Sequence, residues 1–159
     1  MIEIKSPAKL KWDNWGSIFL GGSIEMGIAE DWQAKLTAAL TDYNVALFNP
    51  RRNDWDSTWV QSIDNPQFNE QVNWELSAIE EADFVVFYFD PATKSPITLM
   101  ELGLCAGAGR GLSIIVCCPD GYWRKGNVEI VCKRYGMDFV NTFDELVNQL
   151  KRSLHYAKL

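Results

Sequence analysis

Two kinds of hydrophobic pattern alternate along the chain. Short continuous apolar runs are typical of strands covered on both faces, and they occur at 17–22, 45–50, 83–90, 111–119 and 138–142. The remaining patterned segments predict helices at 27–43, 67–82, 95–109, 127–136 and 143–159. Strands that alternate with helices favour an α/β fold, here a three-layer sandwich with a mostly parallel, flavodoxin-like sheet of about five strands.

The predicted sheet places several loops at one edge. In parallel sheets, ligands bind beyond the carboxyl ends of the strands. A cleft is therefore expected among the loops that start near Gly21, Asn49, Asp90 and Pro119. The polar segment 51–66, rich in Trp and Asp, predicts a loop on the surface or over that cleft. No repeat or linker interrupts the order, so we expect a single domain over residues 1–159.

Charge and composition argue against two kinds of partner, nucleic acids and membranes. With a net charge of −6 and a pI of about 4.8, the chain lacks the basic surface that a nucleic-acid backbone requires. Its apolar runs are shorter than a membrane span, and its first residues lack the apolar core of a secretory signal. We therefore expect a cytoplasmic protein with neither nucleic acid nor membrane as partner.

The cysteines and the single histidine give no metal-site pattern. Cys105, Cys117, Cys118 and Cys132 form no C-x-x-C pair, and we expect them to be buried and reduced. His155 lies near the C-terminus and is expected on the surface of the last helix. A metal site is therefore not expected.

One carboxylate lies on the apolar face of a predicted helix. Phe68, Val72, Leu76 and Ile79 form a stripe at three- and four-residue spacing, and Glu75 falls three residues after Val72 and four before Ile79. A carboxylate in this position either extends to solvent or lines a cleft, and the spacing alone favours neither.

A second carboxylate, Glu101, stands alone in an apolar helix. Ser95 is a good N-cap and Pro96 suits the first helical position, so Glu101 falls in the second turn. Buried glutamates are uncommon unless they are paired or used, and the helix dipole would favour the ionised form that a nucleophile needs. The alternative is a structural ion pair with an arginine: Arg51, Arg52 or Arg110. Two carboxylates that converge on a cleft suit glycosidic chemistry.

The turn after the first predicted strand contains a glycine pair. Gly21 and Gly22 would let a ligand approach the backbone, and Ser23 can donate to it. The segment matches neither the dinucleotide nor the P-loop pattern, and an ordinary strand-to-helix turn is the alternative. Glu25, an acid in the same turn, disfavours a tightly held phosphate.

Four segments in this order resemble the nucleoside 2-deoxyribosyltransferase family and its nucleotide N-glycosidase relatives: FLGGSI, NWELSAIEEADFVV, SPITLMELG and PDGYWRKGN. The resemblance extends from about Ile18 to Phe143. It implies that Glu101, in MELG, is the nucleophile. It also implies that Glu75 is the acid near the leaving base, although this family position is usually Asp, which is one methylene shorter.

The resemblance gives mixed indications about the 5′ group of the sugar. Ser95 matches the position that contacts this group, commonly Asp in the transferases and Ser in the nucleotide hydrolases. Asn127 matches a residue that a neighbouring subunit lends to the same group, and here Asn is typical of the transferases. Glu25 stands where the hydrolases have a basic residue for phosphate, and Phe19 where the family often has Tyr beside the nucleophile. On balance these residues favour a free nucleoside.

The implied reaction is a retaining double displacement without metal or organic cofactor. The base would be recognised by the loop 49–59, through Asn49, Arg51, Asn53 and Trp55, although a tryptophan-rich subunit contact is the alternative there. Three functions stay open: a transferase acting on a deoxynucleoside and a free nucleobase, an N-glycosidase acting on a nucleoside or its 5′-monophosphate, and a non-catalytic nucleotide-binding sensor. The resemblance also implies a homo-oligomer in which Asn127 completes a neighbour's site.

Overall fold

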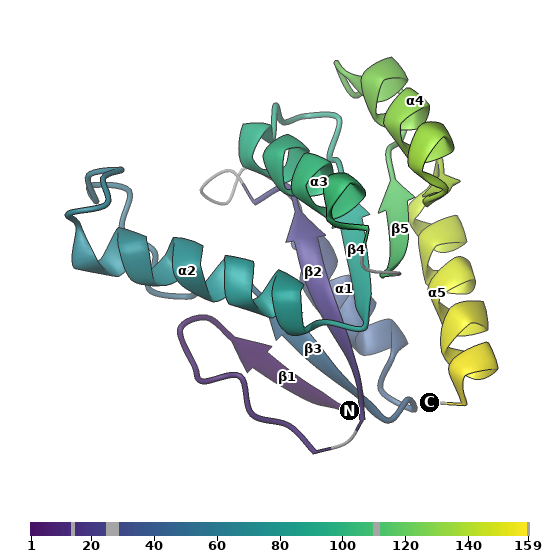
Figure 1. The fold of residues 1–159 in the computed structure, drawn as a ribbon, viewed down its shortest axis with the longest axis horizontal. Helices are drawn as coiled ribbons and strands as arrows, with labels where there is room; N and C mark the ends of the chain where they lie inside the picture. Colours follow the sequence, from purple (N-terminus) through teal and green to yellow (C-terminus); the bar gives the residue numbers. More distant parts are fainter. Residues whose placement is uncertain (14, 25–28, 110–111, 159) are drawn as a thin grey trace.

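A six-stranded parallel sheet forms the centre of the computed structural model, which describes all residues except 14, 25–28, 110–111 and 159 (Figure 1). The strands are β1 (Ile2–Lys5), β2 (Gly16–Gly22), β3 (Val45–Asn49), β4 (Phe84–Tyr88), β5 (Ser113–Cys117) and β6 (Asp138–Val140). Their order across the sheet is β1-β3-β2-β4-β5-β6, and each neighbouring pair is parallel. The helices are α1 (Trp32–Ala39), α2 (Pro66–Glu81), α3 (Pro96–Ala108), α4 (Lys125–Tyr135) and α5 (Phe143–Ala157).

The helices cover both faces of the sheet and enclose two hydrophobic cores. One core joins the sheet to α2, α3 and α4, and the other joins it to α1 and α5. Strand β4 supplies both, because Val85 and Phe87 belong to the first core and Val86 to the second. Successive side chains of a strand point to opposite faces, so a strand covered on both sides is apolar throughout. This explains the continuous apolar runs in the sequence.

The predicted α/β sandwich with a flavodoxin-like parallel sheet is confirmed, with one strand more than expected. The additional strand, β1, lies at the edge of the sheet and pairs with β3, where Ile4 is opposite Phe48. Its apolar residues Ile2 and Ile4 alternate with the charged Glu3 and Lys5. A short alternating edge strand gives no continuous apolar run, so the criterion that predicts the central strands does not detect it.

Local capping fixes where three of the helices begin. Asn65 accepts a hydrogen bond from the backbone N–H of Phe68 (3.0 Å), and Pro66 occupies the first position of α2. Thr142 and Glu145 form a reciprocal capping box at the start of α5. Within the 27–43 segment, the described helix begins only at Trp32, where Asp31 caps it by accepting from the N–H of Ala34.

The cysteine and histidine predictions are confirmed. All four cysteines are free and buried, and His155 is exposed on α5. Within the part of the chain that the structure describes, no helix combines the length and the apolar character needed to cross a bilayer.

Candidate active site

Two helices on the same face of the sheet bring the two candidate carboxylates together. Figure 1 shows α2 and α3 in front of β2 and β4. Glu75 lies in the middle of α2 and is half-buried, whereas Glu101 in the second turn of α3 is only 6% exposed. The negative charge of Glu75 raises the pKa of Glu101, so the two carboxyl groups lie within range of an electrostatic interaction. The structure thus joins two acids that are separated in sequence by a strand and a loop.

Burial disfavours the ionised form of both carboxyl groups. Loss of hydration raises the pKa of Glu101 to about 8, with a further contribution from the charge of Glu75. Loss of hydration also raises the pKa of Glu75 to about 7, and a hydrogen bond from Gln71 opposes that shift. The expected preference of the helix dipole for ionised Glu101 is therefore outweighed, because burial penalises the charged form more strongly.

The proposed structural ion pair of Glu101 finds no support in the described residues. The guanidinium of Arg51 contacts Gln33 and the backbone carbonyl of Glu30. Arg52 forms a bidentate pair with Asp54, at 2.8 and 2.9 Å. Neither arginine reaches Glu101. The third candidate partner, Arg110, lies outside the described residues.

A buried amide that the sequence pattern did not single out contacts Glu75. Gln71 lies one helical turn before Glu75 and is 4% exposed. Its Nε2 donates to Glu75 Oε1 at 2.8 Å and to the carbonyl oxygen of Pro50 at 2.9 Å. Its Oε1 accepts from the Ser6 hydroxyl at 2.5 Å and from Arg52 Nη1 at 3.5 Å. The four-residue spacing to Glu75 is the one signal in the sequence that could have pointed to it.

Three buried hydroxyl groups form a cluster beyond the carboxyl ends of β2 and β4. Ser23 Oγ lies 2.5 Å from Ser95 Oγ, and Thr93 Oγ1 lies 2.9 Å from Ser23 Oγ and 2.8 Å from Ser95 Oγ. The backbone N–H of Asp90 donates to Ser23 Oγ at 2.9 Å. Ser23 and Ser95 were both candidate site residues, and the structure brings them into direct contact. Thr93 completes the cluster and was not predicted.

Ser95 occupies the N-cap position of α3 and Pro96 follows it, as predicted, but the Ser95 side chain does not cap the helix. Its side chain makes no capping hydrogen bond to α3, and its backbone has φ = 46°, the left-handed region that non-glycine residues rarely adopt. This conformation turns the hydroxyl toward Ser23 and Thr93 instead of the first turn of α3. Strained backbone at a buried polar residue is a recognised feature of functional sites.

Tight packing within the sheet accounts for both glycines of the turn. A Cβ at Gly21 would lie 2.7 Å from the ring of Phe87 and 3.0 Å from that of Phe19. A Cβ at Gly22 would lie 2.6 Å from the carbonyl oxygen of Tyr88. Phe19 is fully buried in the core that α2 and α3 share. The ordinary packing role of this glycine pair is thus sufficient to explain it, whereas Glu25 lies outside the described residues.

The structure does not bring Asn49 and Arg51 to the two carboxyl groups. Asn49 Nδ2 donates to Glu3 Oε1 at 2.7 Å, and Asn49 Oδ1 accepts from the backbone N–H of Arg51 at 2.9 Å. Arg51 then extends toward the start of α1, where it bonds to Gln33 at 3.2 Å. Arg52 is the arginine on the α2 side, because it reaches Gln71.

Two further predicted residues, Trp55 and Asn127, are exposed on the surface. Trp55 is 37% exposed and packs on Trp59 with 5.2 Å between ring centres, and Arg52 lies 4.9 Å from the Trp59 ring. Asn127 is exposed in the first turn of α4. The segment before it is fixed near the hydroxyl cluster, because the Tyr122 hydroxyl donates to the carbonyl oxygen of Lys94 at 2.7 Å.

Comparison with known proteins identifies the family of the chain. The family model for nucleoside 2-deoxyribosyltransferase-like proteins matches residues 15–122. The chain belongs to the nucleoside 2-deoxyribosyltransferase-like family. The matched range contains both carboxylates and the whole hydroxyl cluster, and Asn127 lies just beyond it. No curated protein sequence matches the chain.

A solved structure supports the fold of this nucleoside 2-deoxyribosyltransferase-like protein. The chain is similar to a conserved protein from Enterococcus faecalis V583, with a TM-score of 0.63 and 13% sequence identity. The similarity covers 88% of this chain and 99% of the other. At this identity the comparison concerns the fold alone.

Proposed function

We propose that the protein is a nucleoside 2-deoxyribosyltransferase, which exchanges the base of a 2′-deoxynucleoside with retention through a covalent deoxyribosyl-Glu101 intermediate. The observation that carries the proposal is the pair of neighbouring carboxyl groups, Glu75 and Glu101, without an arginine partner among the described residues. A retaining displacement at an anomeric carbon requires two carboxyl groups at the same site. Membership in the family supports the same class of reaction at an N-glycosidic bond.

In the first half of the reaction, an oxygen of ionised Glu101 attacks C1′ of the sugar, and the bond from C1′ to the base nitrogen breaks. The electron pair of that bond goes to the base, which takes a proton from the Glu75 carboxyl directly or through a water. The sugar is then an ester of Glu101, and Glu75 is a carboxylate. A deoxy sugar suits this step, because without the 2′-hydroxyl the oxocarbenium-like state forms more easily.

In the second half, a nitrogen of the acceptor base attacks C1′ and passes its proton to Glu75, while the ester bond breaks and restores the Glu101 carboxylate. Burial raises the pKa of Glu75 to about 7 and that of Glu101 to about 8, so the free pair binds a proton near neutral pH, more tightly at Glu101. The first step starts from the state in which that proton lies on Glu75. If water attacks in place of a base, the same residues make the protein an N-glycosidase. That reaction is the alternative function.

The hydroxyl cluster is the proposed subsite for the 5′ group of the sugar. Ser23, Thr93 and Ser95 suit a 5′-hydroxyl, and acids stand next to them: Asp90 bonds to Ser23 through its N–H, and the N–H of Glu30 bonds to the Asp90 carboxylate at 3.3 Å. These neighbours favour a nucleoside. Three hydroxyl groups can also donate to phosphate, which is the observation in favour of a 5′-monophosphate substrate.

The base would be held by the loop between β3 and α2. The exposed Trp55 offers a ring face for stacking, and Trp59 with Arg52 supports it from behind. Asn49 and Arg51 contribute indirectly, since their bonds to Glu3 and Gln33 hold the start of this loop in place.

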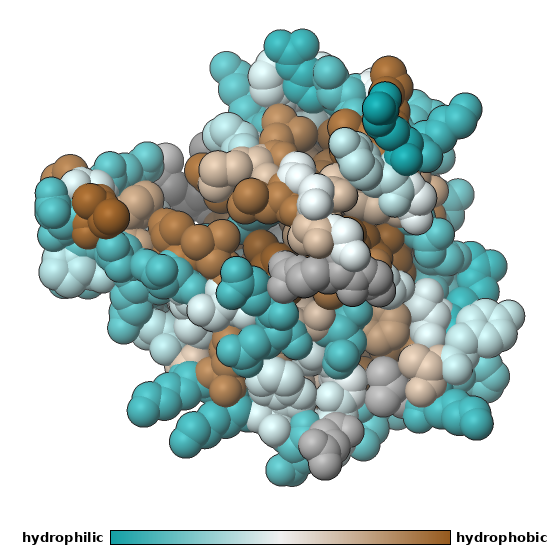
Figure 2. All heavy atoms as spheres, in the orientation of Figure 1, coloured by the Kyte–Doolittle hydropathy of each residue, from teal (hydrophilic) through white to brown (hydrophobic). Residues whose placement is uncertain are grey.

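A second copy of the chain is the proposed macromolecular partner. The outer face of α3 exposes Ile97, Met100 and Leu104, each by more than half, at helical spacing. Figure 2 shows hydrophobic surface over this part of the molecule. A dimer that covers this face would place a partner beside the helix that carries Glu101, close enough for the exposed Asn127 to complete a neighbouring site. The buried, reduced cysteines support the cytoplasm as the location.

Mixing two inactive variants tests the shared site. Glu101→Ala and Asn127→Ala should each be inactive or weakened as homo-oligomers. If subunits share sites, co-expression produces mixed oligomers in which one site carries both changes and another carries none, so activity returns. A monomer by light scattering, or no recovery in isolated mixed oligomers, would contradict the shared site.

Product analysis distinguishes the candidate functions. The protein is incubated with deoxyinosine or thymidine, with and without free adenine or cytosine, and the products are separated by chromatography. A new deoxynucleoside that requires the acceptor identifies the transferase, and base release at the same rate without acceptor identifies the hydrolase. No turnover of nucleosides or their 5′-monophosphates, together with binding, would favour the sensor. Ser95→Asp should retain nucleoside turnover and exclude a monophosphate.

A further inference from the structure

The buried amide of Gln71 has all of its hydrogen-bonding capacity in use. Both hydrogens of Nε2 are engaged, one by Glu75 Oε1 and one by the carbonyl oxygen of Pro50. Oε1 accepts from Ser6 and from Arg52. An amide has two donor hydrogens and two acceptor sites, so no capacity remains for an alternative partner.

This network allows only one orientation of the amide. If the amide were rotated by half a turn, Oε1 would face the carbonyl oxygen of Pro50, which can only accept, and the amide would offer no donor to ionised Glu75. The Arg52 guanidinium would then face an NH₂ group, and two donors would meet. The cost of such unsatisfied buried groups fixes the N–H side toward Glu75. The orientation is set by residues outside α2, up to 65 positions away in sequence.

We propose that Gln71 is a positioning residue for Glu75: its N–H holds Oε1 of the carboxyl in place, leaves Oε2 for the base, and stabilises the carboxylate that remains after proton transfer. This inference rests on the proposed function. In the first half-reaction the proton leaves Glu75 for the base nitrogen, and negative charge develops on the carboxyl that the fixed N–H already contacts. A donor that is in place before the charge develops needs no reorganisation during the reaction.

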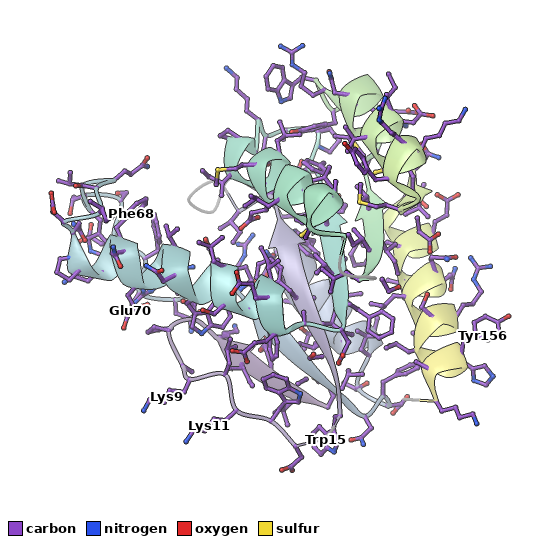
Figure 3. The ribbon with its side chains drawn as sticks, in the orientation of Figure 1. Lys9, Lys11, Trp15, Phe68, Glu70 and Tyr156 are labelled. Atoms are coloured by element: carbon purple, nitrogen blue, oxygen red, sulfur yellow. The ribbon has the colours of Figure 1, made fainter. Side chains whose placement is uncertain are left out.

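The charged groups around Glu75 do not stabilise its carboxylate, which leaves that role to the Gln71 amide. Glu101 faces it from α3 and disfavours a second negative charge. Arg52, from the loop after β3, lies on the far side of Gln71, and its charge is largely offset by Asp54 and by Glu70 at 3.8 Å. The loop after β1 carries Lys9 and Lys11, which extend into solvent away from the site (Figure 3). Among the described residues, the Gln71 N–H is thus the group that directly favours ionised Glu75.

Titration of Glu75 in the whole protein tests the role without relying on turnover. The side-chain carboxyl is followed by ¹³C NMR in protein labelled at glutamate Cδ, and Glu75→Gln identifies its resonance. Gln71→Met keeps the length of the side chain but removes the donor, and it should raise the pKa of Glu75 by about one unit. Gln67→Met, the same change at an exposed amide of α2, is the matched control and should leave the pKa unchanged.

Kinetics give the second readout. Gln71→Met should lower kcat about tenfold while KM changes little, and the descending limb of the pH profile should move to higher pH with the pKa of Glu75. If the substitution prevents folding, Gln71→Asn, whose amide is one methylene short of Glu75, should raise the pKa in the same direction. A Glu75 pKa that stays at its wild-type value in the folded variant overturns the positioning role. A shifted pKa in a protein that turns over no nucleoside or nucleotide contradicts the proposed function alone.

Discussion

Glu101 and Glu145 both lie near the start of a helix, yet their carboxyl groups respond to opposite influences. Glu145 is exposed in the first turn of α5, where hydrogen bonds from the N–H groups of Asn141 and Thr142 lower its pKa. Glu101 is buried in the second turn of α3, where lost hydration and the charge of Glu75 raise its pKa to about 8. The helix dipole acts on both. The comparison teaches that burial and nearby donors, and not the dipole, decide the charge of each.

The two glutamates also differ in what they do for the fold. Glu145 completes the capping box that begins α5, the helix whose leucines 146, 150 and 154 are fully buried in the second core. Glu101 lies in an apolar environment that penalises its charged form, and no arginine among the described residues offsets that penalty. An acid that costs stability and is still present beside a second acid with a raised pKa is a strong candidate for chemistry.

The largest expected effect comes from removing the nucleophile. Glu101→Gln should lower kcat by at least about a thousandfold, because the amide cannot form the ester intermediate. Trapping with substrate followed by intact-mass measurement should detect a deoxyribosyl adduct on the wild-type protein and none on the variant. The exposed Glu145→Gln serves as the control and should keep its activity. Wild-type turnover by Glu101→Gln would mean that another residue is the nucleophile.

The second effect concerns the proton donor. Glu75→Gln should lower kcat about a hundredfold with natural bases, since proton transfer to the leaving base is lost. A deoxynucleoside whose base leaves readily as a weakly basic anion should be affected much less, because it needs no proton. Comparison of kcat for the two substrates measures this difference. An equal loss with both would indicate a role for Glu75 in binding or structure.

The third effect is on the pH dependence of stability, and here the two glutamates should act in opposite directions. The folded pKa of Glu101 lies above its unfolded value, so folded protein binds the extra proton and stability falls as pH rises from about 4.5 to 8. Glu101→Gln should therefore be more stable than wild type above pH 8, by on the order of 5 kcal/mol, and the gain should vanish near pH 4. Denaturant unfolding across this range provides the measurement.

Denaturant unfolding of Glu145→Gln over the acid to neutral range tests whether the two glutamates act in opposite directions. Its folded pKa lies below the unfolded value, so its contribution is present at neutral pH and is lost as pH falls below about 4.5. This variant should be less stable than wild type at pH 7, with a difference that disappears in acid. If both variants deviated from wild type in the same direction, burial would not be the source of the Glu101 shift.

The smallest expected effect comes from removing the N-terminal cap of α5. Thr142→Ala removes the hydroxyl that accepts from the N–H of Glu145 at 3.2 Å and should cost about 1 kcal/mol of unfolding free energy. Activity should be unchanged, because α5 packs on the face of the sheet opposite α2 and α3. Urea unfolding with a parallel activity assay checks both. A loss of activity at unchanged stability would contradict the separation of the two faces.

The sequence by itself determined the central strands and the helices, and it singled out the two carboxylates as candidates. Continuous apolar runs predict strands covered on both sides, and a lone acid in an apolar helix predicts Glu101 at a site, because both signals are local in sequence. Strand β3 shows what the sequence pattern does not predict. All five of its residues are buried, so nothing in VALFN indicates that Asn49 bonds to Glu3, which also accepts from Thr37 of α1, and not to α2.

Only the tertiary structure decided which polar groups meet. The Ser6–Gln71 bond joins residues 65 positions apart, and the Ser23–Ser95 contact joins residues 72 apart. The left-handed backbone at Ser95 is likewise stabilised by its bonds to Ser23 and Thr93, whereas its sequence suggests an ordinary cap. The physical reason is that hydrogen bonds of buried side chains depend on which strands and loops become neighbours, and no local pattern records that choice.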